Sequence, residues 1–226
     1  MSREIQSKHF GVSQIQITLH TGYFITGTMD KVQFFCGVSY SLQHDPMSVW
    51  AHLNPILKKI REEHPYVDTL QLFSDGPTSQ YKQKLKFYLF STELFEHGFK
   101  TGYWNLHTAG HWKGIPDGIG TSLKRSADIR VKHGEDVVNA TQFIKQMHES
   151  GSKVEVYQIQ EQDINEIERK MKDKNIKAIP GTMKIHSLTT EQSEEIKHRQ
   201  ISCVCYDKFC NVHELWSFKI PSGSEK

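Results

Sequence analysis

One carboxylate in this chain stands where α/β proteins commonly form ligand sites. The stretch Leu70 to Lys84 reads LQLFSDGPTSQYKQK, a short apolar strand followed by an Asp75-Gly76-Pro77 turn and the start of a helix. Ligand and metal sites of open α/β sheets form at the carboxyl ends of strands. The pattern therefore predicts a site at Asp75. The structural alternative is a turn-forming residue, because Asp side chains also bond to their own backbone in such turns.

Basic and aromatic side chains surround this position in the sequence. The basic set comprises Lys82, Lys84, Lys86, Lys113, Lys124 and Arg125. Tyr81 and Trp112 are interleaved with them. Lysine and arginine around a site suit a nucleic-acid backbone, and aromatic rings can stack on bases. The six basic residues are therefore candidate DNA or RNA contacts. The alternative is the solvated face of ordinary surface helices.

Two histidines follow one apolar stretch. His107 and His111 lie in HTAGH and have the spacing of two zinc ligands on one helical face. The metalloprotease motif requires Glu directly after the first His, but Thr108 stands there and Gly110 disfavours a helix. We interpret the two histidines as structural, or as groups that position the loop near Asp75.

Four soft ligands are crowded near the end of the chain. Cys203, Cys205, Cys210 and His213 lie in CVCYDKFCNVH. Tetrahedral Cys/His sets bind zinc, but the usual pairing is C-x2-C, and C-x-C on a strand points its thiols to opposite faces. The cluster is a candidate Zn²⁺ site, with ordinary strand cysteines as the alternative. Cys36, alone on a strand face, is predicted to lie in the core.

Length and composition limit the class of protein. The chain has 226 residues, 24% of them charged, and a mean hydropathy of −0.56, values typical of globular domains. It contains no long apolar run and no secretory start, so we expect an intracellular protein, nuclear or cytoplasmic. The formal net charge of +2 is too small to indicate nucleic-acid binding by itself.

The hydrophobic pattern alternates between strand and helix periods. Strands are predicted at residues 14–23 and 32–40, which should form an antiparallel hairpin. Further strands are predicted at 70–75, 100–107, 154–159 and 183–188, with a closing hairpin in 198–220. Helices are predicted at 46–60, where Pro55 should kink or restart the helix, and at 78–97, 121–130, 135–149 and 162–172. A Gly-rich turn is predicted between residues 108 and 120. This order indicates an α/β fold with a composition change after Lys132.

Four segments in a fixed order resemble a protein family. SDGPTSQYK, WNLHTAGHWKG, DGIGTSLKR and IPGTMKIHS are similar to segments of transposon-derived proteins with a ribonuclease H-like core of the integrase or transposase type. The resemblance spans roughly Glu4 to Cys210. It implies a mixed sheet in which three acidic residues hold two divalent cations for phosphoryl transfer. Asp75 matches the second acid and Asp117 the third, which makes both ancestral catalytic residues and Mg²⁺ ligands.

The first acid of that family has no counterpart here. The resemblance places it on an opening strand just before EIQSKHF, and Met1 lies directly before that segment. We therefore expect a chain that lacks the first, central strand. The sheet must then pair in a new way, use residues 2–12 as a replacement, or leave open edges through which chains associate. Two carboxylates should hold Mg²⁺ poorly, because the ion requires near-octahedral oxygen ligation.

The sequence thus predicts a truncated ribonuclease H-like mixed sheet with flanking helices in residues 1–133. A small C-terminal α+β region with the Cys/His cluster is predicted in residues 134–226. Three functions remain open. The first is a non-catalytic, domesticated transposase-derived protein that retains nucleic-acid binding. The second is a metal-dependent nuclease or strand-transferase acting on DNA. The third is a protein-interaction or structural remnant without nucleic-acid affinity.

Overall fold

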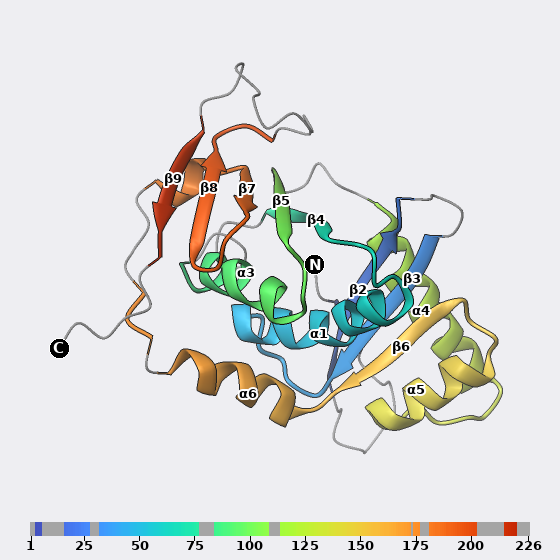
Figure 1. Cartoon of the computed structure of the whole chain (residues 1–226). Helices are drawn as coiled ribbons and strands as arrows, with labels where there is room; N and C mark the ends of the chain where they lie inside the picture. Colours follow the sequence, from blue (N-terminus) through green and yellow to red (C-terminus); the bar gives the residue numbers. More distant parts are fainter. Residues whose placement is uncertain are drawn as a thin grey trace. The chain divides into compact units, whose positions relative to one another are not determined.

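A computed structural model describes residues 3–5, 16–27, 32–76, 84–108, 114–172, 174–176, 181–202 and 215–220 (Figure 1). Its helices are α1 (Pro46–Glu63), α3 (Lys84–Glu96), α4 (Ile115–Lys132), α5 (Ala140–Glu149), α6 (Glu161–Met171) and the short 3-10 helix η1 (Thr182–Lys184). Its strands are β1 (Arg3–Ile5), β2 (Ile17–Ile25), β3 (Val32–Ser39), β4 (Thr69–Gly76), β5 (Thr101–Thr108), β6 (Val154–Ile159), β7 (Ser187–Thr190), β8 (Glu195–Arg199) and β9 (Trp216–Lys219). The mixture of both element types in two mixed sheets makes this an α/β protein, as predicted.

The chain divides into two compact units. The first unit consists of Met1–His44, Ser48–Ile56 and Lys113–Ile167. The second unit consists of Asp45–Met47, Leu57–Trp112 and Glu168–Lys226. Helix α1 begins and ends in the second unit and belongs to the first over Ser48–Ile56, and α6 begins in the first unit and ends in the second. The boundary predicted after residue 133 falls inside the first unit, between α4 and α5.

The first unit contains a four-stranded sheet in the order β1-β2-β3-β6. Strands β2 and β3 form the predicted antiparallel hairpin, in which Leu19 pairs with Val38. Strand β6 then runs parallel to β3, with Phe34 opposite Val154. The short strand β1 pairs with β2 over Ile17–Leu19. Residues 3–5 are thus part of the first sheet, and the loss of an opening strand stays a prediction from the resemblance.

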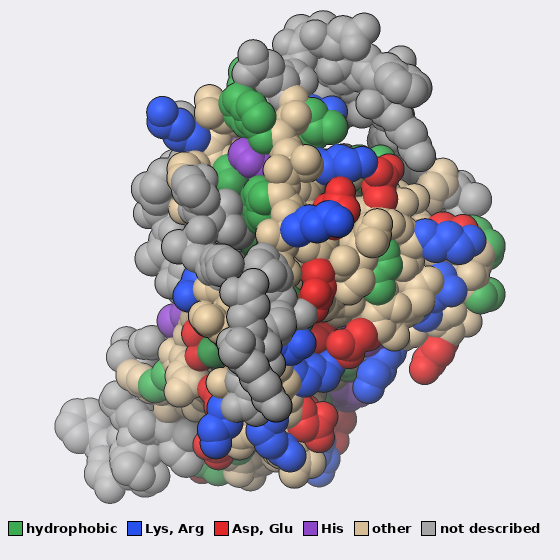
Figure 2. Space-filling view, turned by 60° about the vertical axis from the view of Figure 1, so that its left-hand side comes forward, with side chains coloured by type: hydrophobic (Ala, Val, Ile, Leu, Met, Phe, Trp, Pro, Cys, Tyr) green, Lys and Arg blue, Asp and Glu red, His purple; other side chains and the backbone are tan. Residues whose placement is uncertain are grey.

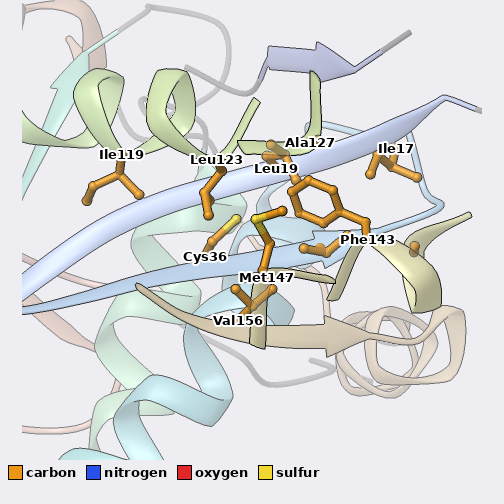
Figure 3. Packing of buried hydrophobic residues seen from close by; sticks show 11 residues of the cluster. Ile17, Leu19, Cys36, Ile119, Leu123, Ala127, Phe143, Met147 and Val156 are labelled. Carbon is orange, nitrogen blue, oxygen red and sulfur yellow. The ribbon is translucent and has the colours of Figure 1, made fainter. Parts of the chain in front are cut away.

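The core of the first unit lies between this sheet and helices α4 and α5 (Figure 3). Side chains along β2, β3 and β6 point alternately to the two faces of the sheet, so every second side chain points to this core. The fully or nearly fully buried cluster comprises Ile17, Leu19, Cys36, Val38, Ile119, Leu123, Ala127, Ala140, Phe143, Met147 and Val156. Cys36 is therefore a core residue, as predicted.

Helix α1 packs on the opposite face of the same sheet. His52 of α1 is buried and its ring stacks on His20 of β2, with 5.4 Å between the ring centroids. It also lies directly over Gly37, where an added Cβ would collide with the His52 ring. Burial lowers the pKa of His52 to about 4, with a smaller contribution from His44. A glycine in β3 thus allows a neutral histidine to approach the backbone.

The second unit contains a five-stranded sheet in the order β4-β5-β7-β8-β9. Strands β4 and β5 are parallel, whereas β7, β8 and β9 continue the sheet in antiparallel pairs. Helix α3 covers one face. On that face a Cβ at Gly102 would collide with Leu94 of α3, and the Trp104 ring lies 5.4 Å from the Phe90 ring. The closing hairpin predicted in 198–220 is only partly observed: β9 lies within it, but its partner β8 runs from Glu195 to Arg199, and residues 203–214 lie outside the described residues.

The strands that the resemblance assigns to one sheet lie in two. Strands β2 and β3 pair with β6, and β4 and β5 pair with β7. The region after residue 133 therefore forms no sheet of its own, because β6 completes the first sheet and β7, β8 and β9 complete the second. Among the described residues, β1 pairs only with β2 and β4 pairs only with β5, so no ladder joins the two sheets. A ribonuclease H-like arrangement remains a prediction from the resemblance.

Two local predictions need correction. Helix α4 begins at Ile115, so DGIG lies in its first turns and not in a Gly-rich turn. Pro116 at the start explains this, since proline is favourable in the first helical turn, where its missing N–H has no partner to lose. Helix α1 also runs through Pro55 as one helix of 18 residues, without a restart.

Candidate functional site: the polar face of the second sheet

Asp75 lies where the sequence places it, at the carboxyl end of a strand. It is the second-to-last residue of β4 and pairs in register with His107, the second-to-last residue of β5. The two strands are parallel, so their carboxyl ends meet at the same edge of the sheet. Asp75 and His107 are thus neighbours at the type of position where open sheets bind ligands. This agrees with the interpretation of His107 as a residue near the acid.

Register places the polar residues of five strands on one face. Pairing extends across the sheet in rows, and rows alternate between the faces because side chains alternate along each strand. One polar row runs Gln71, Tyr103, Thr189, Lys197 and Ser217, and the next runs Phe73, Asn105, Ser187 and Arg199. The row between them is mostly apolar: Leu72, Trp104, Leu188, His198 and Trp216. We call the side of the two polar rows, together with His107, Glu195 and Lys219, the polar face.

An exposed aromatic pair lies on the polar face near Asp75. Phe73 keeps 48% of its surface exposed. Its ring stacks on that of His107, with 6.0 Å between centroids and 13° between planes. Lys219 is exposed and Lys197 is half-buried on the same face, where Lys197 forms an ion pair with Glu191. Exposed aromatic rings and basic groups on one sheet face are the elements of a surface that stacks bases and contacts phosphates.

The second predicted acid, Asp117, belongs to the first unit. It lies in the first turn of α4, where a carboxylate interacts favourably with the helix dipole. Its backbone N–H donates to the carbonyl oxygen of Gly114 at 3.1 Å, and its own carbonyl accepts a hydrogen bond from Thr121. Asp75 belongs to the second unit. The meeting of the two acids around Mg²⁺ therefore remains a prediction.

One of the predicted nucleic-acid contacts is wrong. Lys86 is fully buried in helix α3, and most neighbouring positions of this helix are buried as well. Burial lowers its pKa to about 6, although the carboxylate of Asp45 acts in the opposite direction. A largely neutral, buried amine cannot contact a phosphate backbone. Lysines spaced along a helix usually indicate a solvent-exposed face, but almost every side of this helix is buried.

The other predicted basic contacts have different surroundings. Lys84 is exposed, but its Nζ donates a hydrogen bond to the carbonyl oxygen of Ile176 at 2.7 Å. Lys124 is half-buried and Arg125 exposed, both on α4 of the first unit. Lys82 and Lys113 lie outside the described residues. Figure 2 shows basic and acidic side chains interspersed on the face that it presents, so no continuous basic surface supports the prediction there.

The candidate metal ligands fall only partly within the described residues. Those residues contain no group of three or more His, Cys, Asp or Glu side chains arranged to hold a metal ion. Cys203, Cys205, Cys210, His213 and His111 all lie outside the described ranges. The side chain of Asp75 is likewise not described. Mg²⁺ at Asp75 and Asp117, and Zn²⁺ at the cysteine cluster, therefore stay predictions.

A charged cleft of about 590 Å³ in the second unit was not predicted from the sequence. Lys170 of α6 bridges two carboxylates of α3 there, with Nζ 3.1 Å from Glu93 Oε1 and 2.6 Å from Glu96 Oε2. Tyr88 donates a hydrogen bond to Glu194 Oε1 at 3.0 Å. Burial raises the pKa of Glu93, against the lowering effect of Lys170. These contacts link α3 to α6 and to Glu194, just before β8, and Lys170 offsets part of the carboxylate charge.

Comparison with known proteins adds a family. The model of a family described as a domain of unknown function, DUF8701, matches residues 1–202. The searches of curated proteins and of solved structures gave no match. In the described parts of the chain, no helix is long and apolar enough to cross a membrane. Since the match covers most of the sequence, the chain belongs to the DUF8701 family.

Proposed function

We propose that this protein is a transposase-derived, non-catalytic protein that binds single-stranded nucleic acid on the polar face of its second sheet. The observation that carries the proposal is the exposed Phe73 ring, stacked on His107 beside the carboxyl ends of β4 and β5. Aromatic rings on a sheet face stack on unpaired bases, which also expose the edges that such proteins read. The proposal places the protein in the nucleus or cytoplasm.

Charge on the polar face supports the same proposal. Lys197, Arg199 and Lys219 lie on this face with two acidic residues, Asp75 and Glu195, and Lys197 is paired with Glu191. Asn105, Ser187, Thr189 and Arg199 in the middle of the face are buried. A strand with a base stacked on Phe73 would therefore meet Lys219 and the half-buried Lys197 on the β8–β9 side. About two phosphate contacts give a modest salt dependence, with a slope of about −1.4 for a single strand.

Replacing Phe73 with Ala is expected to weaken binding of a single-stranded oligonucleotide. Loss of one stacking platform costs about 1–3 kcal/mol, a decrease in affinity of roughly 5- to 150-fold. Fluorescence anisotropy with labelled DNA and RNA strands measures the effect. Tyr66→Ala is the matched control, because Tyr66 is a 65% exposed aromatic residue outside the polar face. Equal affinity of Phe73→Ala and Tyr66→Ala would show that nucleic acid does not bind here.

The alternative is a metal-dependent nuclease, and one observation favours it. Asp75 stands beside His107 at the carboxyl ends of two parallel strands, a position suited to phosphoryl transfer. Under our proposal the intact chain cleaves neither single- nor double-stranded DNA with Mg²⁺ or Mn²⁺, and Asp75→Ala leaves oligonucleotide binding within about twofold. Metal-dependent cleavage that disappears in Asp75→Ala would establish the nuclease and refute the non-catalytic proposal.

A further inference from the structure

The polar face contains a buried cation that has no counter-ion among the described residues. Arg199, the last residue of β8, keeps 8% of its surface exposed. Its Nε is buried, and within the described ranges no hydrogen bond or ion pair involves its guanidinium group. Arginine remains charged at any pH that a folded protein experiences. A buried guanidinium nitrogen without a partner is unfavourable, and an anion beside it would remove that cost.

A buried amide lies in the same row. Asn105 of β5 is 1% exposed, and in the part of the chain that the structure describes neither its Oδ1 nor its Nδ2 has a hydrogen-bond partner. Buried side-chain amides almost always have partners, and an unmade bond costs the full desolvation of the group. A leucine has the same branching at Cγ and no polar group to desolvate. A polar residue that lowers stability at this position indicates a binding role.

The two groups face each other across one strand. Asn105 pairs with Ser187 of β7, and Ser187 pairs with Arg199 of β8. Adjacent strands are about 4.8 Å apart, so the backbones of Asn105 and Arg199 are separated by about 10 Å with the Ser187 hydroxyl between them. Side chains from both ends can reach one small group in the middle. The row thus supplies a guanidinium, a hydroxyl and a carboxamide to the same place.

We propose that this row, Asn105–Ser187–Arg199, binds a phosphate group. The Arg199 guanidinium matches two phosphate oxygens in a bidentate pair. Asn105 Nδ2 and the Ser187 hydroxyl donate to a further oxygen, which a carboxylate does not have. Asn105 Oδ1 accepts a hydrogen bond from a hydroxyl of the molecule that carries the phosphate. The proposal rests on the function proposed above only for the identity of that molecule, a nucleic-acid strand.

Inorganic phosphate is the probe that separates this row from the rest of the polar face. We expect phosphate to raise the Tm of the intact chain, relative to sodium chloride and to acetate at equal ionic strength, because it binds the folded state alone. Arg199→Met is expected to abolish this rise. Without phosphate, Arg199→Met should also melt at a higher temperature than the natural chain, since the unpaired charge is gone.

Three matched variants sharpen the result. Arg169→Met removes the same charge from an exposed position of α6 and should leave the phosphate response unchanged. Arg199→Lys keeps the charge but loses the bidentate geometry, so the response should shrink by about tenfold in affinity. Asn105→Leu should repeat both effects of Arg199→Met, a weaker response and a higher Tm without phosphate. A lower Tm for both Arg199→Met and Asn105→Leu would mean that these residues are structural, which would overturn the proposal.

The outcomes distinguish this inference from the proposed function. Failure of phosphate to stabilise the intact chain more than acetate does would overturn the inference. If oligonucleotides bind through Phe73 while Arg199→Met binds them equally well, the row is not a phosphate site but the function stands. If phosphate binds through Arg199 and no oligonucleotide binds, the phosphate site stands and nucleic acid is not its ligand.

Discussion

Replacing Lys86 with Met is expected to stabilise the protein at neutral pH and to flatten the dependence of its stability on pH. Lys86 is fully buried, and its pKa falls from 10.5 to about 6 on folding. Between these values the unfolded chain binds the proton and the folded chain does not. The free energy of unfolding of the natural protein therefore rises with pH across that window, by up to about 1.4 kcal/mol per pH unit.

Methionine has the same unbranched shape and no charge, so the variant does not lose stability as pH falls from 10.5 to 6. At pH 7 we expect a gain on the order of 2–4 kcal/mol. Urea unfolding followed by circular dichroism at pH 6, 7, 8 and 9 measures both effects. Lys145→Met on the exposed face of α5 is the control and should leave the slope unchanged. A destabilised Lys86→Met with an unchanged pH slope would show that the buried amine is charged in the folded protein.

Replacing Phe143 with Ala should cost about 3–5 kcal/mol of the free energy of unfolding. The ring is fully buried and lies among Leu19, Met147 and Val156 between the first sheet and its two helices (Figure 3). Phe143 has the largest side chain in this buried cluster. Its removal leaves a cavity that the sheet on one side and the helices on the other cannot close.

Hydrogen exchange shows which elements lose stability in Phe143→Ala. Amides of β2, β3 and β6 should lose protection in Phe143→Ala. Ile129→Ala provides the control, because Ile129 of α4 is 45% exposed and its truncation should change stability by less than about 0.5 kcal/mol. A cost below about 1 kcal/mol for Phe143→Ala would contradict the packing in Figure 3.

The local elements follow from the sequence because their signals are local. Alternation of apolar residues gave the β2–β3 hairpin, and Val154 to Ile159 was bounded correctly as a strand. Gly98 follows α3 with a φ of 81°, the left-handed conformation that glycine favours at helix C-termini. Asp75 was placed at a strand end by the same kind of reasoning. Each of these predictions depends on a short run of consecutive residues.

What was missed depends on pairings between distant segments. No pattern in β3 indicates that its partner is β6, and none in β5 indicates β7. The polar row of Asn105, Ser187 and Arg199 exists only through that second pairing, since the three residues lie on three strands. Ser187 and Arg199 carry no motif of their own. The burial of Lys86 likewise results from surroundings that its helix periodicity does not reveal.

The parallel pairing of β3 with β6 joins Phe34 to Val154, so about half of the chain must be synthesised between the two partners. Closing so large a loop costs chain entropy before the contacts between β3 and β6 can offset it, and this slows folding. During translation, the backbone amides and carbonyls on one edge of β3 remain unpaired until β6 has left the ribosome. A chain that ends near His133 would keep that row open permanently, and such edges recruit strands from other molecules.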